Sequence, residues 1–130
     1  MAGYGVAIEK KTLDNEFFRK VLFTGKYAQL VVMCLQPGEE IGNEVHKKVD
    51  QFFRIEKGQA LFVFAGRKKH LAKNGDAVIV PAGTFHNVIN ASKTAKLKLY
   101  TLYSPANHPD KTVHRTRAAA ERAEAKKHHK

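Results

Sequence analysis

"GDAVIVPAGTFHNVIN", residues 75–90, places a glycine, a Pro-Ala-Gly turn, a histidine and an asparagine between apolar runs. Five residues separate Gly75 from Pro81, and two separate Gly83 from His86. Proline and glycine are typical of turns, and short apolar runs bounded by turns are typical of β-strands. The stretch therefore predicts two strands joined by a turn, with His86 at the start of the second strand.

A second polar group lies upstream, in "GEEIGNEVHKKVDQFFRIEKG", residues 38–58. Side chains at positions i and i+2 of a strand point to one face, so we predict that Glu44 and His46 project together. If Gln51 opens the next strand and faces the same way, all three converge with His86. Two imidazoles and a carboxylate form a common ligand set for divalent iron, and an amide oxygen adds a weaker donor. The alternative is that these residues are unrelated surface or packing groups.

Most of the remaining chain consists of short runs of β-forming residues separated by turn residues, which favours an all-β sandwich or barrel. The Lys57-Gly58-Gln59 segment is predicted to be a tight hairpin turn. Only the C-terminal segment, rich in Ala, Glu, Lys and Arg, has the composition of a helix, and it is expected to be helical or disordered. The expected strands are residues 27–36, 51–58, 60–66, 76–80, 86–91 and 96–103.

Both stretches together resemble the two sequence motifs of the cupin family, in the same order. The family's second motif has Gly, Pro-x-Gly, His and Asn, and residues 75–90 match it at every position. The first motif has His-x-His followed by Glu between glycines. Here His46 matches, whereas Glu44 replaces the first histidine and Gln51 replaces the glutamate. The resemblance covers residues 36–103 and implies a double-stranded β-helix, the jelly-roll barrel of cupins.

The resemblance also implies a divalent metal ion, Zn, Fe, Mn or Ni, held by Glu44, His46, Gln51 and His86. The usual ligand set has one carboxylate and three neutral imidazoles, and this set again has one carboxylate. The total ligand charge is therefore preserved, which favours retained metal binding over loss of the site.

The residues around these ligands are expected to have structural roles. Phe53 and Ile55 share strand parity with Gln51 and are expected to line the same cavity, whereas Phe52 and Arg54 face the other way. Asn90 is expected to bond backbone near a turn, Cys34 to be a buried small residue, and Phe85 to face away from the metal.

The resemblance to small cupins labelled mannose-6-phosphate-isomerase-like favours an isomerase that acts on a sugar or sugar-phosphate-like carbonyl compound, with Glu44 as the catalytic proton acceptor. A cupin dioxygenase and a non-catalytic metabolite-binding module are the alternatives. His108 and His114 are expected to be exposed loop residues. A homodimer is also expected, as small cupins pair through an outer sheet face.

The 130 residues predict one domain, with the barrel and its N-terminal strands in residues 1–108 and a basic tail in residues 109–130. The net charge of +11 would help an anionic small molecule to arrive, while nucleic acid is a less favoured partner because aromatic residues do not interleave with the basic clusters. No apolar run is long enough to span a membrane. Cys34 is the only cysteine, which fits a cytoplasmic protein.

Overall fold

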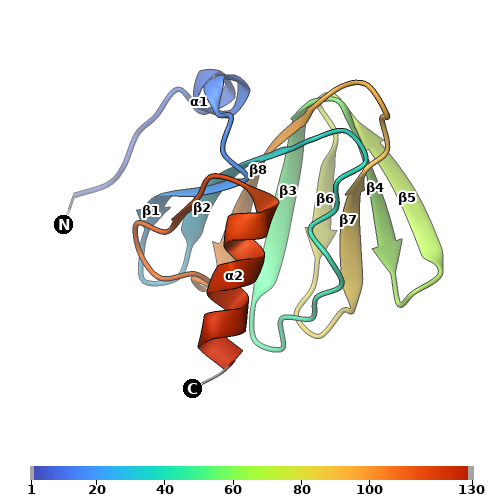
Figure 1. The fold of residues 1–130 in the computed structure, drawn as a ribbon. Coiled ribbons are helices and arrows are strands. Elements are labelled where there is room, and N and C mark those ends of the chain that lie inside the picture. The colour runs from blue at the N-terminus through green and yellow to red at the C-terminus, as the bar shows by residue number, and fades with distance from the viewer. Residues whose placement is uncertain (1, 129–130) are drawn as a thin grey trace.

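The computed structural model describes residues 2–128 of the chain, with side chains described up to residue 125. Nine strands and two helices follow one another along these residues (Figure 1). Their order is α1 (Ile8–Asp14), β1 (Arg19–Thr24), β2 (Gln29–Leu35), β3 (Asp50–Lys57), β4 (Gln59–Phe64), β5 (Lys68–Lys73), β6 (Ala77–Val80), β7 (His86–Asn90), β8 (Leu97–Ser104), β9 (Val113–His114) and α2 (Arg117–His128).

The strands form two antiparallel sheets that face each other and enclose the core. One sheet has six strands in the order β6-β3-β8-β2-β1-β9, and the other has three in the order β5-β4-β7. Figure 1 shows β4, β5 and β7 on one side of the molecule and β1, β2 and β8 on the other. The predicted all-β jelly-roll barrel is confirmed, and so is its C-terminal helix.

The predicted hairpin at Lys57-Gly58-Gln59 is wrong. β3 pairs with β6 and β8, whereas β4 pairs with β5 and β7, so the chain leaves one sheet at Lys57 and enters the other at Gln59. Gly58 has a φ of 103°, which β-branched and bulky residues rarely adopt. This glycine therefore lies at a corner between the two sheets. The turn residues alone had predicted that the strands on either side of it pair with each other.

Replacing Gly58 by alanine should destabilise the barrel by about 2–3 kcal/mol. A Cβ there would lie 2.9 Å from the carbonyl oxygen of Lys96, in addition to the unfavourable φ. Urea unfolding of Gly58→Ala measures the loss. Gly38→Ala is the matched control, since Gly38 also has a positive φ but no atom within 4 Å of its Cβ position. Equal losses in both variants would show that the contact with Lys96 has no effect.

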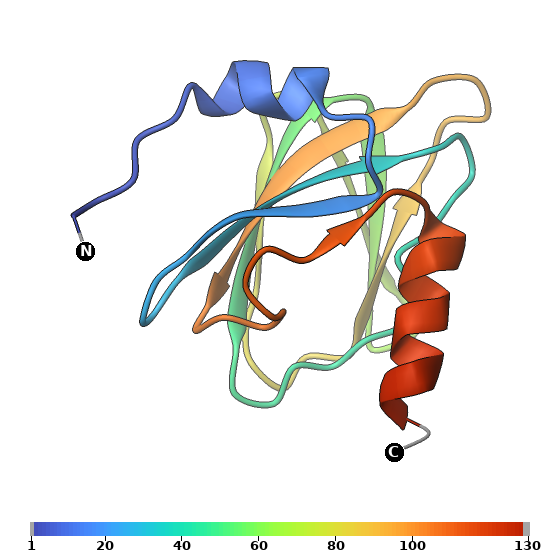
Figure 2. The ribbon, with the colours of Figure 1, turned by 60° about the vertical axis from the view of Figure 1, so that its left-hand side comes forward.

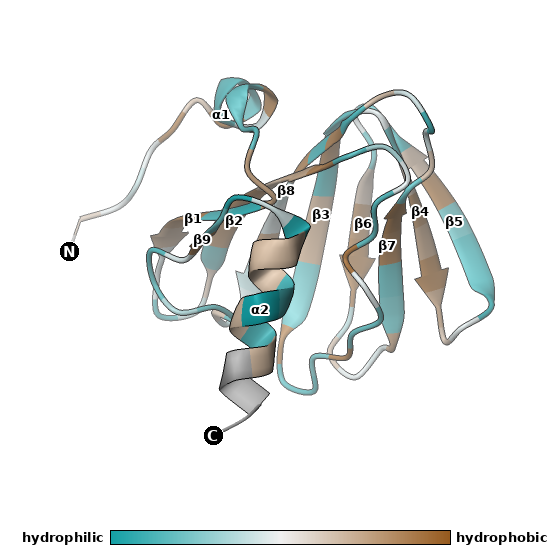
Figure 3. Ribbon diagram, in the orientation of Figure 1, coloured by the Kyte–Doolittle hydropathy of each residue, from teal (hydrophilic) through white to brown (hydrophobic). Residues whose placement is uncertain are grey.

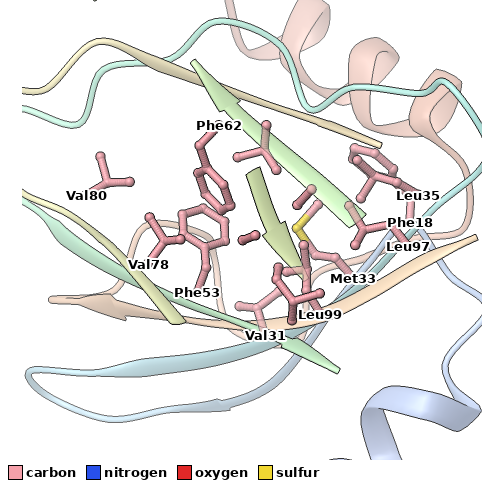
Figure 4. Packing of buried hydrophobic residues seen from close by; sticks show 14 of the residues in the cluster. Phe18, Val31, Met33, Leu35, Phe53, Phe62, Val78, Val80, Leu97 and Leu99 are labelled. Carbon is pink, nitrogen blue, oxygen red and sulfur yellow. The ribbon is translucent and has the colours of Figure 1, made fainter. Parts of the chain in front are cut away.

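The core lies between the sheets and comes from alternate residues of each strand. In β3 the residues Gln51, Phe53 and Ile55 are buried, while Phe52 and Arg54 on the other face are partly exposed. This alternation is the one predicted from the sequence. The apolar residues concentrate on the strands, as the hydropathy colouring shows (Figure 3). Figure 4 shows the close packing of Phe53 against Phe62, whose ring centroids are 5.0 Å apart.

An N-terminal helix, α1, precedes the first strand, and the sequence analysis did not anticipate it. The Lys98 ammonium donates a hydrogen bond to the Leu13 carbonyl at 2.6 Å and contacts the Glu16 carboxylate, which also contacts Lys96. These contacts join the end of α1 and the segment after it to the β8 region. The two lysines, Lys96 first, hold the pKa of Glu16 down to about 2.

The Glu16 interactions should make part of the stability dependent on pH. Because the folded-state pKa lies below the usual value of 4.5, the stabilisation is present above pH 4.5 and is lost as the pH falls towards 2. Glu16→Gln should therefore lower the Tm at pH 7 by a small amount, since the carboxylate is exposed. The Tm difference from the parent should shrink between pH 4.5 and pH 2, and a difference that is constant with pH would contradict this account.

The C-terminal segment returns to the barrel and is ordered through α2. β9 pairs with β1, and the Val21 amide donates to the Thr112 carbonyl at 2.9 Å. α2 then lies beside the strands (Figure 2), and its Ala120 is buried against the core cluster. Of the two predicted states of the tail, the helical one is confirmed and the disordered one is wrong. The predicted boundary between residues 108 and 109 stays a prediction.

Candidate metal centre

Glu44 and His46 lie in the loop before β3 and not on a long strand, so the strand argument that placed them together is wrong in its detail. They are held by backbone pairing with the β7 region. The Glu44 amide donates to the His86 carbonyl at 2.8 Å, and the His86 amide donates to the Glu44 carbonyl at 2.9 Å. The Gly83 amide donates to the His46 carbonyl at 2.8 Å. The Pro-Ala-Gly turn thus fixes the loop that carries the first two site residues.

The structure brings the side chains of Glu44, His46 and His86 together. One ligand atom from each lies within 4.8 Å of the others, and His46 Nε2 is 3.6 Å from Glu44 Oε1. Donors around one ion, at bond lengths of about 2.0–2.2 Å, are separated by roughly 3–4 Å. The 3.6 Å spacing of His46 and Glu44 falls in this range, and the three side chains form a group that could hold a metal ion.

Two histidine nitrogens at this point are buried and have no hydrogen-bond partner, namely His46 Nε2 and His86 Nε2. A buried polar atom without a partner is costly unless a bound group satisfies it. The other ring nitrogen of His86, Nδ1, lies 2.9 Å from the Thr84 carbonyl oxygen. Donation from Nδ1 to that oxygen leaves Nε2 as the lone-pair nitrogen, which is the arrangement usual for metal-binding histidines.

Gln51 is buried on β3, opposite Tyr103 of β8. Its Nε2 donates to Thr101 Oγ1 at 3.0 Å, while its Oε1 is buried without a partner. Because this amide oxygen has no hydrogen-bond partner, its lone pairs can serve as the fourth, weaker donor to a metal ion. The role of Gln51 as a metal ligand stays a prediction.

A cavity of about 440 Å³ is lined by Glu44 and His46, two of the three converging residues. The barrel contributes one wall, which includes Glu44, His46 and Arg19, and α2 contributes the other, which includes Arg117 and Glu121. The volume is sufficient for a small metabolite. The C-terminal segment thus supplies part of the candidate site.

The buried Tyr103 and the half-buried His108 form a pair beside the site that the sequence analysis missed. The Tyr103 ring meets the His46 ring edge-on with centroids 5.9 Å apart, and its hydroxyl lies 3.2 Å from His108 Nε2. Burial raises the pKa of Tyr103, so the phenol is neutral. The residue shares strand parity with Leu99 and Thr101, which could have indicated its inward position.

The expectation of exposed loop histidines is wrong for both His108 and His114, which are half-buried. His108 contacts Tyr103, and His114 Nδ1 lies 3.1 Å from an Arg19 guanidinium nitrogen. The cause is the return of the C-terminal segment to β1, which composition does not reveal.

Other predicted roles are confirmed. Asn90 bonds the backbone, since its amide nitrogen donates to the carbonyls of Leu35, Gln36 and Ala95. Cys34 is a buried small residue whose pKa is raised by burial. Phe85, expected to face away from the metal, is 45% exposed.

A family model described as "Cupin domain" matches residues 31–103, more than half of the chain. With the fold and both motifs in place, the chain belongs to the cupin family.

Three similar proteins extend this assignment. The Bacillus subtilis (strain 168) protein YrkC, described as uncharacterized, is 48% identical over 124 residues, which cover 92% of this chain and 66% of YrkC. The mimivirus protein L612, from Acanthamoeba polyphaga mimivirus and also described as uncharacterized, is 46% identical over 108 residues, covering 82% of this chain and 68% of L612. The chain thus spans about two thirds of the length of these relatives. The crystal structure of BH2720 from Bacillus halodurans is similar with a TM-score of 0.89 and 40% identity, over 93% of this chain and 95% of that one.

Neither helix among residues 2–128 combines the length and the apolar character that a membrane crossing requires.

Proposed function

We propose that the chain is a metal-dependent enzyme that isomerises a small hydroxy-carbonyl compound. The observation that carries the proposal is the convergence of Glu44, His46 and His86, with two buried imidazole nitrogens that lack partners, beside a cavity of metabolite size. Glu44, His46 and His86 would hold the ion, with Gln51 as a fourth donor. Oxygen and nitrogen donors suit Zn, Fe, Mn or Ni in the divalent state.

The ion would supply Lewis acidity towards a carbonyl or hydroxyl oxygen when bound. Glu44 is the residue suited to accept a proton, because a carboxylate has two oxygens and only one is needed as a ligand. Its side chain is 30% exposed, compared with 11% for His46. The Glu44 carboxylate is therefore the more accessible of the two to a substrate in the cavity.

A cupin dioxygenase is the second candidate, favoured by one observation. Two imidazoles and one carboxylate, with the remaining coordination positions open, are the ligand set of many non-haem iron oxygenases. The group Glu44, His46 and His86 has this composition.

Proton exchange tests the proposal and separates these candidates. Protein loaded in turn with Zn, Mn, Ni or Fe is incubated with a panel of hydroxy-carbonyl compounds, including sugars and sugar phosphates, in deuterated water. We expect deuterium incorporation next to a carbonyl and formation of an isomer, both lost in Glu44→Gln. Consumption of dioxygen without isomer formation would favour the dioxygenase. Tight ligand binding without any product would identify a non-catalytic binding module.

We also propose that two copies pair through the outer face of the six-stranded sheet, and that the protein is cytoplasmic. Ile79 on that face is 65% exposed, and Phe52, Tyr100 and Leu102 beside it are only partly buried. An apolar sheet face of this kind is typical of an interaction surface. Sedimentation equilibrium measures the association state, and a monomer at micromolar concentration would contradict pairing.

A further inference from the structure

Arg19 is a buried cation in the wall of the metal cavity. It lies on β1, and only 5% of its surface is exposed. It lines the same cavity as Glu44 and His46. Arginine is seldom buried to this extent without a partner of opposite charge, so its surroundings indicate what it binds.

No carboxylate within residues 2–125 forms a salt bridge with Arg19. Its Nη1 donates to His114 Nδ1 at 3.1 Å, its guanidinium lies 5.2 Å from the Phe18 ring centroid, and its Nε is buried without a partner. A side-chain hydrogen bond also joins Arg19 to the Tyr103 phenol, which is neutral and does not offset the charge. Burial and the neighbouring Arg19 charge lower the pKa of His114, so that imidazole is neutral. The described partners therefore leave the Arg19 charge uncompensated.

The carboxylates that line the cavity have other contacts. Glu121 forms a salt bridge with Arg117 at 2.5 Å, and Glu44 belongs to the metal group. The negative charge of Glu124 raises the pKa of His114, but by less than burial and Arg19 lower it. Of the two arginines that line the cavity, Arg117 therefore has a carboxylate partner within the described residues and Arg19 does not. A singly charged anion would compensate the charge of Arg19.

We propose that Arg19 binds the carboxylate group of the substrate, whose carbonyl or hydroxyl oxygen lies towards Glu44, His46 and His86. The substrate class is thus a small oxo- or hydroxycarboxylate. The position of the carbonyl or hydroxyl oxygen rests on the metal-dependent function proposed above, whereas the contact between Arg19 and the carboxylate does not.

The chemistry of the guanidinium supports a carboxylate. Nε and the neighbouring Nη present two parallel N–H donors, which fit the two oxygens of a carboxylate. A phosphate has oxygens of similar geometry but carries up to two negative charges, which exceed the single positive charge of Arg19.

Calorimetric titration of the metal-loaded protein with pyruvate and with hydroxyacetone tests the assignment. Hydroxyacetone has the methyl ketone of pyruvate and carries a hydroxymethyl group in place of the carboxylate. We expect pyruvate to bind at least tenfold more tightly, as a hydrogen bond to a charged group implies. Arg19→Gln should abolish this preference while the metal content stays unchanged. Arg54→Gln, on the outer face of the same sheet, is the matched control and should retain the preference.

Three results would overturn the proposal. They are no measurable pyruvate binding, a preference for pyruvate that survives in Arg19→Gln, and a higher affinity for phosphate than for pyruvate. If Arg19→Gln fails to fold, Arg19→Lys replaces it, because lysine keeps the charge and loses the fork, and an undiminished preference then contradicts the assignment. The titration is repeated on metal-free protein. An Arg19-dependent pyruvate preference in protein that takes up no metal would refute the metal-dependent function and retain the carboxylate subsite. Metal uptake without that preference would refute the carboxylate subsite and retain the metal-dependent function.

Discussion

His86→Ala is expected to abolish tight metal binding while the barrel remains folded. His86 contributes one of the three converging ligand atoms, and its Nε2 is buried without a protein partner. Loss of a residue that only orients a ligand weakens metal binding by roughly 10- to 100-fold, and loss of a ligand itself should exceed this. The measurement is the apparent Kd for Zn, determined by competition with a chelator.

His70→Ala is the matched control, because His70 lies exposed on β5 and outside the metal group. It should leave the Kd unchanged. Circular dichroism of His86→Ala should retain the β-sheet signal of the parent. An unchanged Kd in folded His86→Ala would remove this residue from the site.

Phe53→Ala should produce the largest loss of stability, about 3–5 kcal/mol. Phe53 is fully buried on β3 between the two sheets and packs against Phe62. Removal of the ring loses apolar contacts on both sides and leaves a cavity that closely packed neighbours fill only in part. The free energy of unfolding in urea is the quantity to measure.

Phe52→Ala is the control for this prediction, since Phe52 is the next residue and lies on the opposite, partly exposed face of β3. It should cost less than half as much as Phe53→Ala. Similar losses in the two variants would show that the inner face of β3 does not form the core of the barrel.

The sequence predicted those features that depend on local alternation and on turn residues. Gln51, Phe53 and Ile55 were placed on one face of a strand, and the structure buries all three. Asn90 was predicted to bond backbone near a turn, and it donates to three carbonyls. Such properties follow from the period of a strand and from the chemistry of one side chain, so a short window of sequence is enough to find them.

Features that depend on long-range pairing were not found. Gly58 has the same local signature in a hairpin and in a corner between sheets, and only the partners of β3 and β4 distinguish them. Arg19 and Tyr103 are more than eighty residues apart, and they reach one site because β1 and β8 both pair with β2. The C-terminal segment has a polar composition, yet it supplies one wall of the cavity.

Elemental analysis of the purified protein tests the central claim most directly. The protein is prepared without metal-affinity chromatography and with His128 and His129 replaced by serine, because this pair, whose side chains lie outside those described, would bind stray metal. We predict close to one divalent ion per chain after reconstitution, and its loss in both Glu44→Ala and His46→Ala. A parent protein that takes up no metal, or variants that retain it, would contradict the account.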